Sequence, residues 1–271
     1  MTMNSLPMLI AVAPNGARRT KKDHPKLPIT PVELARTASA CVKAGAAMMH
    51  LHVRDSAGRH TLDLGRYLSA VREVEAAVGD TMLLQVTSEA AGIYEADRQI
   101  DLMERLAPHC LSCGLREFVK DRQWFVRAER FFFRLYRAGI LIQYILYSPE
   151  DVSWYEQLCR LGVLPGESHF LLFVLGRYTD KICEQYGLTD YVKSLERKSR
   201  WMACAFGRNE YSVMKQAADL GGHARVGFEN NLLLPNGSLA ADNAELVRIT
   251  AETVRQAGRP PGNKKFAETL F

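Results

Sequence analysis

Short apolar segments alternate with amphipathic helical patterns along the whole chain of 271 residues. Eight segments have the length and residue types of buried strands, and a polar loop and a helical pattern follow each one. The expected strands cover residues 9–13, 46–53, 82–87, 110–113, 140–146, 170–175, 201–205 and 224–228. The expected helices cover residues 30–44, 65–78, 96–106, 123–137, 148–162, 179–197, 209–220 and 242–256. Because strands that alternate with helices run parallel, this order predicts an α/β fold with one parallel sheet.

Eight such units in a chain of this length predict a closed TIM (β/α)8 barrel rather than an open, doubly wound sheet. The doubly wound alternative usually has fewer strands and a G-x-G-x-x-G phosphate loop after its first strand. Here that loop reads Pro14-Asn15-Gly16-Ala17-Arg18, which does not match. No linker or low-complexity segment interrupts the pattern, so we expect one barrel domain over residues 1–271.

Three of the expected helices begin with clear N-terminal signals. Thr30 can cap the first helix, Pro31 suits its first position, and Glu33 completes a capping box. Ser148 and Asp242 are the expected N-caps of two later helices.

Two histidines lie near the end of the second expected strand, in the sequence His50-Leu51-His52-Val53. Side chains at positions i and i+2 of a strand point to the same face, so His50 and His52 project together. Two imidazoles held side by side provide half of a metal site. Taken alone, the pair could equally be two core histidines that hydrogen-bond to the backbone.

The functional residues of a TIM barrel gather at the carboxyl-terminal ends of its strands. In this sequence those positions are much more polar and charged than the strand interiors. They are Asn15, His50, His52, Arg54, Asp55, Thr87, Ser88, Glu89, Ser112, Arg116, Glu117, Tyr147, Arg177, Arg208, Arg225, Glu229 and Asn230.

Glu229 is the natural third ligand of a metal at this end of the barrel. It follows the eighth strand, which neighbours the first strand of a closed barrel, and the first neighbours the second. Its carboxylate can therefore approach His50 and His52. Two histidines and one carboxylate, with an open position, form a catalytic zinc site, although other divalent metals also fit. The alternative roles of Glu229 are an acid at a helix N-terminus and an ion-pair partner of Arg225.

Other residues at the strand ends suit substrate binding. Arg225 can hold a carboxylate or carbonyl oxygen, or support the metal ligands. Arg18 and Arg19 in the first loop can attract an anionic substrate, and solvated charge is the alternative role for both. Hydroxyl groups that can donate to a substrate are those of Thr87, Ser88 and Ser112.

The composition is ordinary for a soluble globular protein, with 47% hydrophobic and 24% charged residues. A net charge of +5 suits small anionic substrates, but no long basic run with interleaved aromatic residues indicates nucleic acid binding. No apolar run reaches the roughly 20 residues of a membrane span. The apolar stretch at residues 8–13 lacks the flanks of a signal peptide. The six cysteines lie in apolar segments, which predicts reduced thiols in the cytoplasm.

Two further groups of residues are expected to be structural. Cys110 and Cys113 form a C-x-x-C pair in a strand-like segment, and buried thiols are favoured there over a redox or zinc site because no second pair follows. The remaining histidines fall in loops or before strands, and we expect most of them on the surface. They are His24, His60, His109, His169 and His223.

Several of these segments, taken together, resemble the β-keto acid cleavage enzyme family over nearly the full length of the chain. They are LPITP at residues 27–31, HLHVRD at residues 50–55, the strand end Thr87-Ser88, the pair Gly207-Arg208, and LGGHARVGFENNL at residues 220–232. The resemblance implies a TIM barrel, a homotetramer, and a zinc ion that His50, His52 and Glu229 hold.

The resemblance also implies a reaction. In this family a β-keto acid and acetyl-CoA exchange acyl groups in a retro-Claisen reaction, which gives acetoacetate and a new CoA thioester. Zinc polarises the keto group and anchors the keto acid. Arg225 and the residue at position 230 would assist the chemistry, and Ser112 and Thr87 would bind substrate oxygens. The remaining expected substrate-binding residues are Asn15, Arg18, Ser88, Glu89, Arg116 and Arg208.

The sequence departs from the family pattern at two places. Many members have an acid after the metal-binding glutamate, where this chain has Asn230, and an asparagine cannot act as a base. The first loop reads Asn15-Gly-Ala-Arg-Arg19, where some members have a glutamate for an amino substrate. This loop argues against a cationic amino keto acid and favours a substrate with an anionic or neutral side chain.

Two other functions compete with this one. Metal hydrolases of the amidohydrolase type also use His-x-His on a barrel strand, but they need further histidines at the ends of strands five and six. The fifth expected strand has no histidine, and His169 precedes the sixth. A barrel that binds a metabolite or a metal without catalysis is the non-enzyme alternative, which the loss of the acid at Asn230 leaves open.

Overall fold

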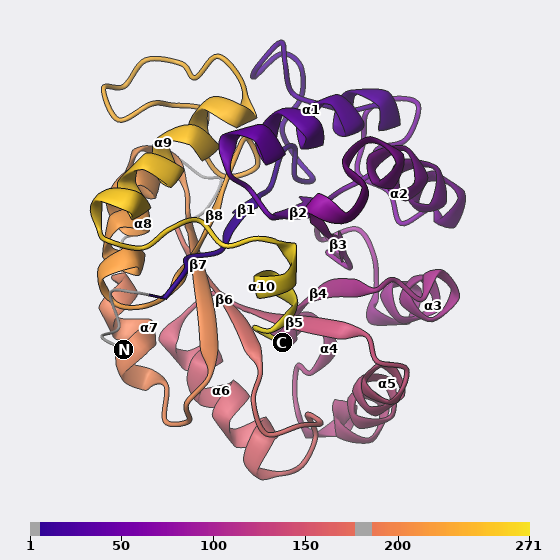
Figure 1. Ribbon diagram of the computed structural model, residues 1–271. Helices are drawn as coiled ribbons and strands as arrows, with labels where there is room; N and C mark the ends of the chain where they lie inside the picture. The colour runs from indigo at the N-terminus through magenta and orange to yellow at the C-terminus, as the bar shows by residue number, and fades with distance from the viewer. Residues whose placement is uncertain (1–5, 177–185) are drawn as a thin grey trace.

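The computed structural model describes residues 6–176 and 186–271, and its strands form a closed parallel barrel (Figure 1). The strands are β1 (Ile10–Val12), β2 (Met48–Leu51), β3 (Leu83–Thr87), β4 (Cys110–Gly114), β5 (Leu141–Leu146), β6 (Phe170–Leu175), β7 (Arg200–Ala205) and β8 (His223–Val226). Each strand pairs in parallel with the next one along the chain, and β8 pairs with β1. The predicted TIM (β/α)8 barrel is confirmed.

Helices surround the strands in the order that the sequence predicts (Figure 1). They are α1 (Pro31–Ala44), α2 (Leu64–Val78), α3 (Ala96–Leu106), α4 (Leu115–Phe118), α5 (Phe125–Arg137), α6 (Pro149–Arg160), α7 (Leu188–Ser194), α8 (Glu210–Asp219), α9 (Asn243–Gln256) and α10 (Lys264–Glu268). Short 3-10 turns are η2 (Gly79–Thr81), η3 (Arg122–Trp124) and η4 (Gly207–Asn209). Among the described residues, no helix is both long and apolar enough to cross a membrane.

The predicted helix starts are confirmed. The Thr30 side chain accepts from the Glu33 backbone N–H, and the Glu33 side chain accepts from the Thr30 N–H, so the capping box forms. The Ser148 hydroxyl caps α6 and the Asp242 carboxylate caps α9. These side chains satisfy backbone N–H groups that the first turn of a helix leaves unpaired.

Two short helices, α4 and α10, were not predicted. The helix expected at residues 179–197 can be compared with the structure only in part. The helix α4 consists of four residues directly after β4, and α10 has five, so both are too short to show a helical period. Of the helix expected at 179–197, the structure shows α7, while residues 177–185, with Arg177, lie outside the described residues.

The α10 segment closes one end of the barrel. In Figure 1 it lies over the centre of the ring of strands, and Ala267 and Leu270 pack in the interior cluster beside Leu9 and Phe170. Leu9 precedes β1 and Phe170 begins β6, so α10 covers the amino-terminal ends of the strands. The carboxyl-terminal ends lie at the opposite side, where a TIM barrel places its chemistry.

Candidate active site

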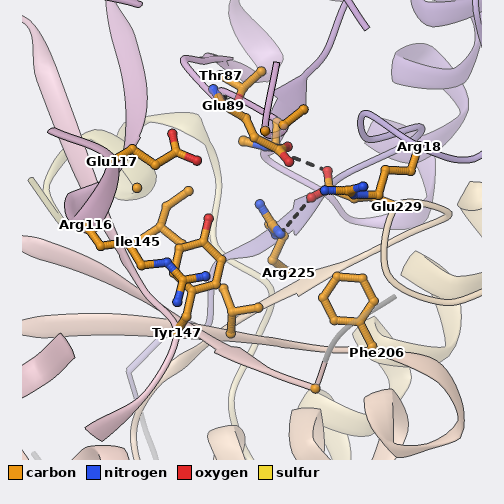
Figure 2. Close-up of a pocket in the computed structure, with 16 residues that line it drawn as sticks. Arg18, Thr87, Glu89, Arg116, Glu117, Ile145, Tyr147, Phe206, Arg225 and Glu229 are labelled. Carbon is orange, nitrogen blue, oxygen red and sulfur yellow. Dashed lines mark hydrogen bonds and ion pairs between the residues drawn. The ribbon is translucent and has the colours of Figure 1, made fainter. Parts of the chain in front are cut away.

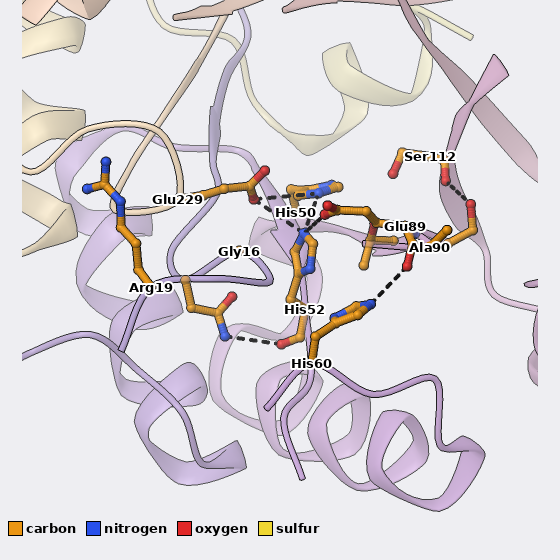
Figure 3. Close-up of polar contacts among 12 residues, drawn as sticks. Gly16, Arg19, His50, His52, His60, Glu89, Ala90, Ser112 and Glu229 are labelled. Atoms are coloured by element: carbon orange, nitrogen blue, oxygen red, sulfur yellow. Dashed lines mark hydrogen bonds and ion pairs between the residues drawn. The ribbon is translucent and has the colours of Figure 1, made fainter. Parts of the chain in front are cut away.

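His50, His52 and Glu229 meet at the carboxyl-terminal end of the barrel (Figure 3). His50 lies in β2, and His52 lies just past its end. The Nε2 atoms of the two histidines are 3.0 Å apart, and the Glu229 Oε2 atom is 3.3 Å from His52 Nε2 and 3.7 Å from His50 Nε2. All three residues are buried. The predicted meeting of these side chains is thus present in the structure.

The barrel interior sets the orientation of His50. Its Nδ1–H donates to Gln85 Oε1 at 2.8 Å, and the Gln85 amide nitrogen donates to Gln143 Oε1 at 3.1 Å. With the proton on Nδ1, the Nε2 lone pair of His50 points to His52 and Glu229. Burial lowers the pKa of His50 to about 3, so the ring is neutral and ready to act as a ligand.

Arg225 keeps Glu229 ionised. Its Nη2 atom donates to Glu229 Oε1 at 3.0 Å, and both side chains are buried. Burial alone would raise the pKa of the Glu229 carboxyl, but Arg225 and the two histidines outweigh burial and hold that pKa well below its usual value.

These side chains suit a divalent cation. Glu229 Oε2 is buried and has no hydrogen-bond partner among the described residues. The Nε2 atoms of His50 and His52 face each other. When both rings are neutral, at most one of these two nitrogens can carry a proton in the space between them. A cation between the three groups would satisfy both lone pairs and the carboxylate oxygen at once, with two histidines and one carboxylate as in catalytic zinc sites.

The turn that carries Glu229 is fixed by close packing against β1. Gly227 has φ +132°, and a Cβ atom there would lie 2.5 Å from Ala13 O, so only glycine fits. The Ala13 carbonyl accepts from the Glu229 N–H at 3.0 Å. Buried Glu210 accepts from the Gly227 N–H at 3.4 Å and from the Asn231 amide at 3.1 Å. Hydrogen bonds at Gly227, Glu229 and Asn231 therefore fix the backbone around Glu229 to the barrel.

A cavity of about 430 Å³ opens beside the cluster (Figure 2). His50 and Glu229 form part of its wall, and its polar lining also includes Arg18, Thr87, Glu89, Arg116, Glu117 and Arg225. Ile145, Tyr147, Val174 and Phe206 supply apolar surface. A cavity of this size, with charged groups on an apolar wall, suits a small organic acid.

The charges of the cavity are distributed over two sides (Figure 2). Arg116 lies 3.9 Å from the centre of the Tyr147 ring, on the side opposite Glu229 and Arg225. Glu117 Oε2 accepts from the Ala90 N–H at 3.2 Å and from the Gln99 amide. Burial raises the pKa of the Glu117 carboxyl and that of Glu89.

Five residues expected at the site hold other positions. The Asn15 amide donates to the Pro28 and His52 carbonyl oxygens, so it holds the backbone of His52 in position. The Ser88 hydroxyl donates to Ser112 O at 2.8 Å. Ser112 Oγ and both side-chain polar atoms of Asn230 are buried and have no hydrogen-bond partner among the described residues. Arg208 is exposed in η4, and none of these side chains is among those that line the cavity.

The expectation that most other histidines lie on the surface was wrong. His24, His60, His169 and His223 are buried, and among the five only His109 is exposed. Each buried ring hydrogen-bonds to the backbone, as where His60 Nε2 donates to Glu89 O at 2.8 Å (Figure 3). Loop position is a poor guide to exposure, because loops of a barrel fold back over its ends.

Gln85 and Gln143 were missed as functional residues. Each is a polar side chain in an otherwise apolar strand. That contrast is visible in the sequence, but only the pairing of His50 with Gln85 across β2 and β3 shows what the amide does. The prediction of buried thiols is confirmed, since Cys110 packs inside the barrel and Cys113 packs outside it against the helices.

The family model for the beta-keto acid cleavage enzyme matches residues 7–271. The chain belongs to the β-keto acid cleavage enzyme family. This agrees with the barrel and with the cluster of His50, His52 and Glu229, and the family resemblance that the sequence motifs indicate is confirmed.

Relatives of known activity match along most of their length. A 3-keto-5-aminohexanoate cleavage enzyme of Fusobacterium nucleatum is 30% identical over 93% of each chain. An enzyme of the same name from Acetoanaerobium sticklandii is 28% identical over 97% of each chain. A 3-oxoadipate:acetyl-CoA acetyltransferase of Cupriavidus necator is 27% identical over 98% of this chain and 94% of its own.

Solved structures with low sequence identity share the fold. The apo structure of ObcA superposes with a TM-score of 0.69 at 17% identity. The match covers 91% of this chain and 65% of that one, so the chain spans about two thirds of its length.

Proposed function

We propose that this protein is a zinc-dependent acyltransferase that cleaves a β-keto acid with acetyl-CoA as co-substrate. The products are acetoacetate and the CoA thioester of the remaining acyl group. The bond between the keto carbon and C2 of the keto acid breaks. The acetyl group of acetyl-CoA bonds to C2, and CoA bonds to the acyl group that is released, so atoms balance without an oxidant. The single observation that carries the proposal is the convergence of His50, His52 and Glu229 beside the cavity, whose wall includes His50 and Glu229.

In this proposal His50, His52 and Glu229 hold the zinc ion. When bound, the ion acts as a Lewis acid toward the keto group and anchors the keto acid. Gln85 and Asn15 keep the two histidines in place through the contacts described above.

Arg225 is the proposed catalytic cation of the protein. It lines the cavity and already binds one Glu229 oxygen, so its charge lies where negative charge develops on a substrate oxygen. Thr87 lines the cavity, and its hydroxyl accepts from the Glu89 N–H at 3.1 Å, so its O–H proton is available to a substrate oxygen. Ser112 and Asn230 would take part only after a local movement of the wall, although their unpaired polar atoms favour a partner there.

The proposed substrate has an anionic or neutral side chain. Arg18 and Arg116 line the cavity, whereas the first loop presents Asn15 with its amide engaged by backbone carbonyl oxygens. The relative from Cupriavidus necator bears the name of an enzyme that acts on 3-oxoadipate, a keto acid with a second carboxylate.

Two measurements test the function. Metal analysis of the purified protein is expected to find about one zinc ion per chain, and much less in His50→Ala. A panel of β-keto acids with acetyl-CoA is expected to yield acetoacetate with at least one member. Zinc-loaded protein that is silent across the whole panel would contradict the proposal and favour a hydrolase or a binding barrel. The hydrolase has little support, because β5 has no histidine and His169 donates to Pro165 O ahead of β6.

We also propose a homotetramer in the cytoplasm, where acetyl-CoA is available. Support comes from the family resemblance and from buried thiols that suit a reducing compartment. Light scattering after size-exclusion chromatography tests the tetramer, and a mass near that of one chain, 30.4 kDa, would contradict it.

A further inference from the structure

Glu89 places a second carboxylate beside the two histidines of the His-His-Glu cluster. It follows β3, and its Oε2 atom lies 3.7 Å from His52 Nε2, the nitrogen that also faces Glu229 (Figure 3). In the part of the chain that the structure describes, no N–H or O–H group donates a hydrogen bond to the Glu89 carboxylate. The 3.7 Å approach to His52 Nε2 is its one close polar contact among those residues.

The backbone of Glu89 is held on both sides. Its N–H donates to Thr87 Oγ1 at 3.1 Å, and its carbonyl oxygen accepts from His60 Nε2 at 2.8 Å. The first bond lies within the turn that follows β3, and the second joins this turn to the loop that follows β2. These bonds hold the backbone of Glu89 beside the cluster, and its side chain extends from there toward His52.

Glu117, in the same cavity, shows how hydrogen-bond donors satisfy a buried carboxylate. It receives hydrogen bonds from the Ala90 N–H and the Gln99 amide. Glu89 has no such donors among the described residues, and its side chain is 22% exposed. A largely buried carboxylate without donors is costly unless a positive charge lies beside it.

We propose that Glu89 is a further protein ligand of the cation that His50, His52 and Glu229 hold. The inference rests on the metal site proposed above. Donor atoms that share a zinc ion at about 2.1 Å lie about 3.4 Å apart in a tetrahedral site. The distances from His52 Nε2 to His50 Nε2, Glu229 Oε2 and Glu89 Oε2 are 3.0, 3.3 and 3.7 Å, which bracket that value.

Glu89 reaches the cation by a small movement of its own side chain. The group whose donor atoms all lie within 4.8 Å of one another comprises His50, His52 and Glu229 but not Glu89. Glu89 lines the cavity, so its carboxylate has room to rotate inward. Catalytic zinc sites sometimes expand to five ligands, so a site held by these four residues would still leave room for a keto acid oxygen beside Glu89. A site with two histidines and two carboxylates also binds Mn²⁺ better than one with a single carboxylate.

Metal titration tests this role without an activity assay. Zn²⁺ and Mn²⁺ are titrated into metal-free wild-type protein, Glu89→Gln and Glu117→Gln, in competition with a chelator. Glu89→Gln has nearly the shape of the native residue, and circular dichroism checks that it folds. We expect Glu89→Gln to weaken zinc binding at least about tenfold and Mn²⁺ binding more, and Glu117→Gln to match the wild type. The visible spectrum of the Co²⁺-loaded protein is expected to change only in Glu89→Gln.

The two proposals fail in different ways. Equal metal affinities and identical Co²⁺ spectra in wild type and Glu89→Gln would overturn the role of Glu89, even if that variant lost activity. Wild-type protein that binds no divalent metal would overturn both the metal site and this ligand.

Discussion

Gln85 accepts the Nδ1 proton of His50 at 2.8 Å inside the barrel, on the side of the ring away from His52 and Glu229. The Gln85 amide is itself oriented by Gln143 Oε1 at 3.1 Å. The hydrogen bonds through the Gln85 and Gln143 side-chain amides therefore orient the His50 ring so that its Nε2 atom faces the cavity. Outer partners of this kind fix the tautomer of a ligand histidine.

Replacing Gln85 by leucine should weaken metal binding while the ligands themselves stay unchanged. Leucine has a similar size but accepts no hydrogen bond, so the Nδ1 proton of His50 is left unpaired in the core. We expect zinc affinity to fall about 10- to 100-fold in a chelator competition. Gln85→Glu keeps an acceptor and is the matched control. Wild-type affinity in Gln85→Leu would show that the amide does not orient the ring.

Removing Arg225 should destabilise the metal-free protein more than the zinc-loaded protein. Arg225→Met leaves the buried Glu229 carboxylate without its ion-pair partner, which costs about 3–5 kcal/mol of unfolding free energy. Bound zinc supplies positive charge to the same carboxylate and should reduce that loss. Urea denaturation with and without zinc measures both values.

The control for Arg225 is Arg160→Met, which breaks an exposed ion pair with Glu196. It should cost less than about 1 kcal/mol in either state. The same loss for Arg225→Met with and without zinc would contradict a cation at Glu229.

The sequence was sufficient to predict the barrel and the meeting of His50, His52 and Glu229, because both follow from the spacing of residues along the strands and from the order of the strands. The i, i+2 spacing puts His50 and His52 on one face, and barrel closure brings Glu229 from β8 to them across β1. Contacts that depend on register or loop shape were not predictable. Gln85 meets His50 only through the pairing of β2 with β3, and Glu89 meets His52 only because two loops fold together.

Burial was hardest to predict where loops pack over the barrel ends. The sequence offers no period in a loop, so buried His60 was expected at the surface. The burial of the Asn230 amide, which has no hydrogen-bond partner among the described residues, was likewise not predictable, because the residues that contact the Asn230 backbone, Arg19 and Gly207, come from two other loops.

Stability should fall with acid through His223. Its Nδ1 atom accepts the Leu9 N–H at 3.0 Å, and burial lowers its pKa from 6.5 to about 3. Between these two values the unfolded chain binds a proton that the folded chain does not. Stability from this group is therefore present above pH 6.5 and is lost as the pH falls toward 3, by at most about 1.4 kcal/mol per pH unit.

Unfolding in urea at several pH values measures this effect. His223→Asn keeps an acceptor without a titrating ring, so its stability should fall less steeply between pH 6 and pH 4. His109→Asn removes an exposed histidine and should keep the wild-type slope. Parallel slopes for His223→Asn and the wild type would rule out a contribution from His223.

Cys110 and Cys113 should resist thiol reagents in the folded protein. Burial raises the pKa of both thiols, and they face opposite sides of the β4 strand. Labelling followed by peptide mass spectrometry is expected to find them unmodified in the native state and modified in urea. Cys159 is less buried and should react earlier. Rapid native labelling of Cys110 or Cys113, or a disulfide between them, would show that the pair is not structural.

Glu210 should control metal affinity from outside the cavity. It begins α8, and its two carboxyl oxygens accept from the Gly227 N–H and the Asn231 amide, on either side of Glu229. Glu210→Leu keeps the volume but removes both acceptors, so the turn can relax and carry Glu229 away from His52. We expect zinc affinity to fall about tenfold, with a smaller loss in Glu210→Gln, which retains one acceptor oxygen. Asp219→Leu, at the exposed end of the same helix, should leave zinc affinity unchanged. A lower melting temperature with unchanged zinc affinity in Glu210→Leu would mean that Glu210 supports the fold and not the ligand, because only a positioning role links this carboxyl to the metal.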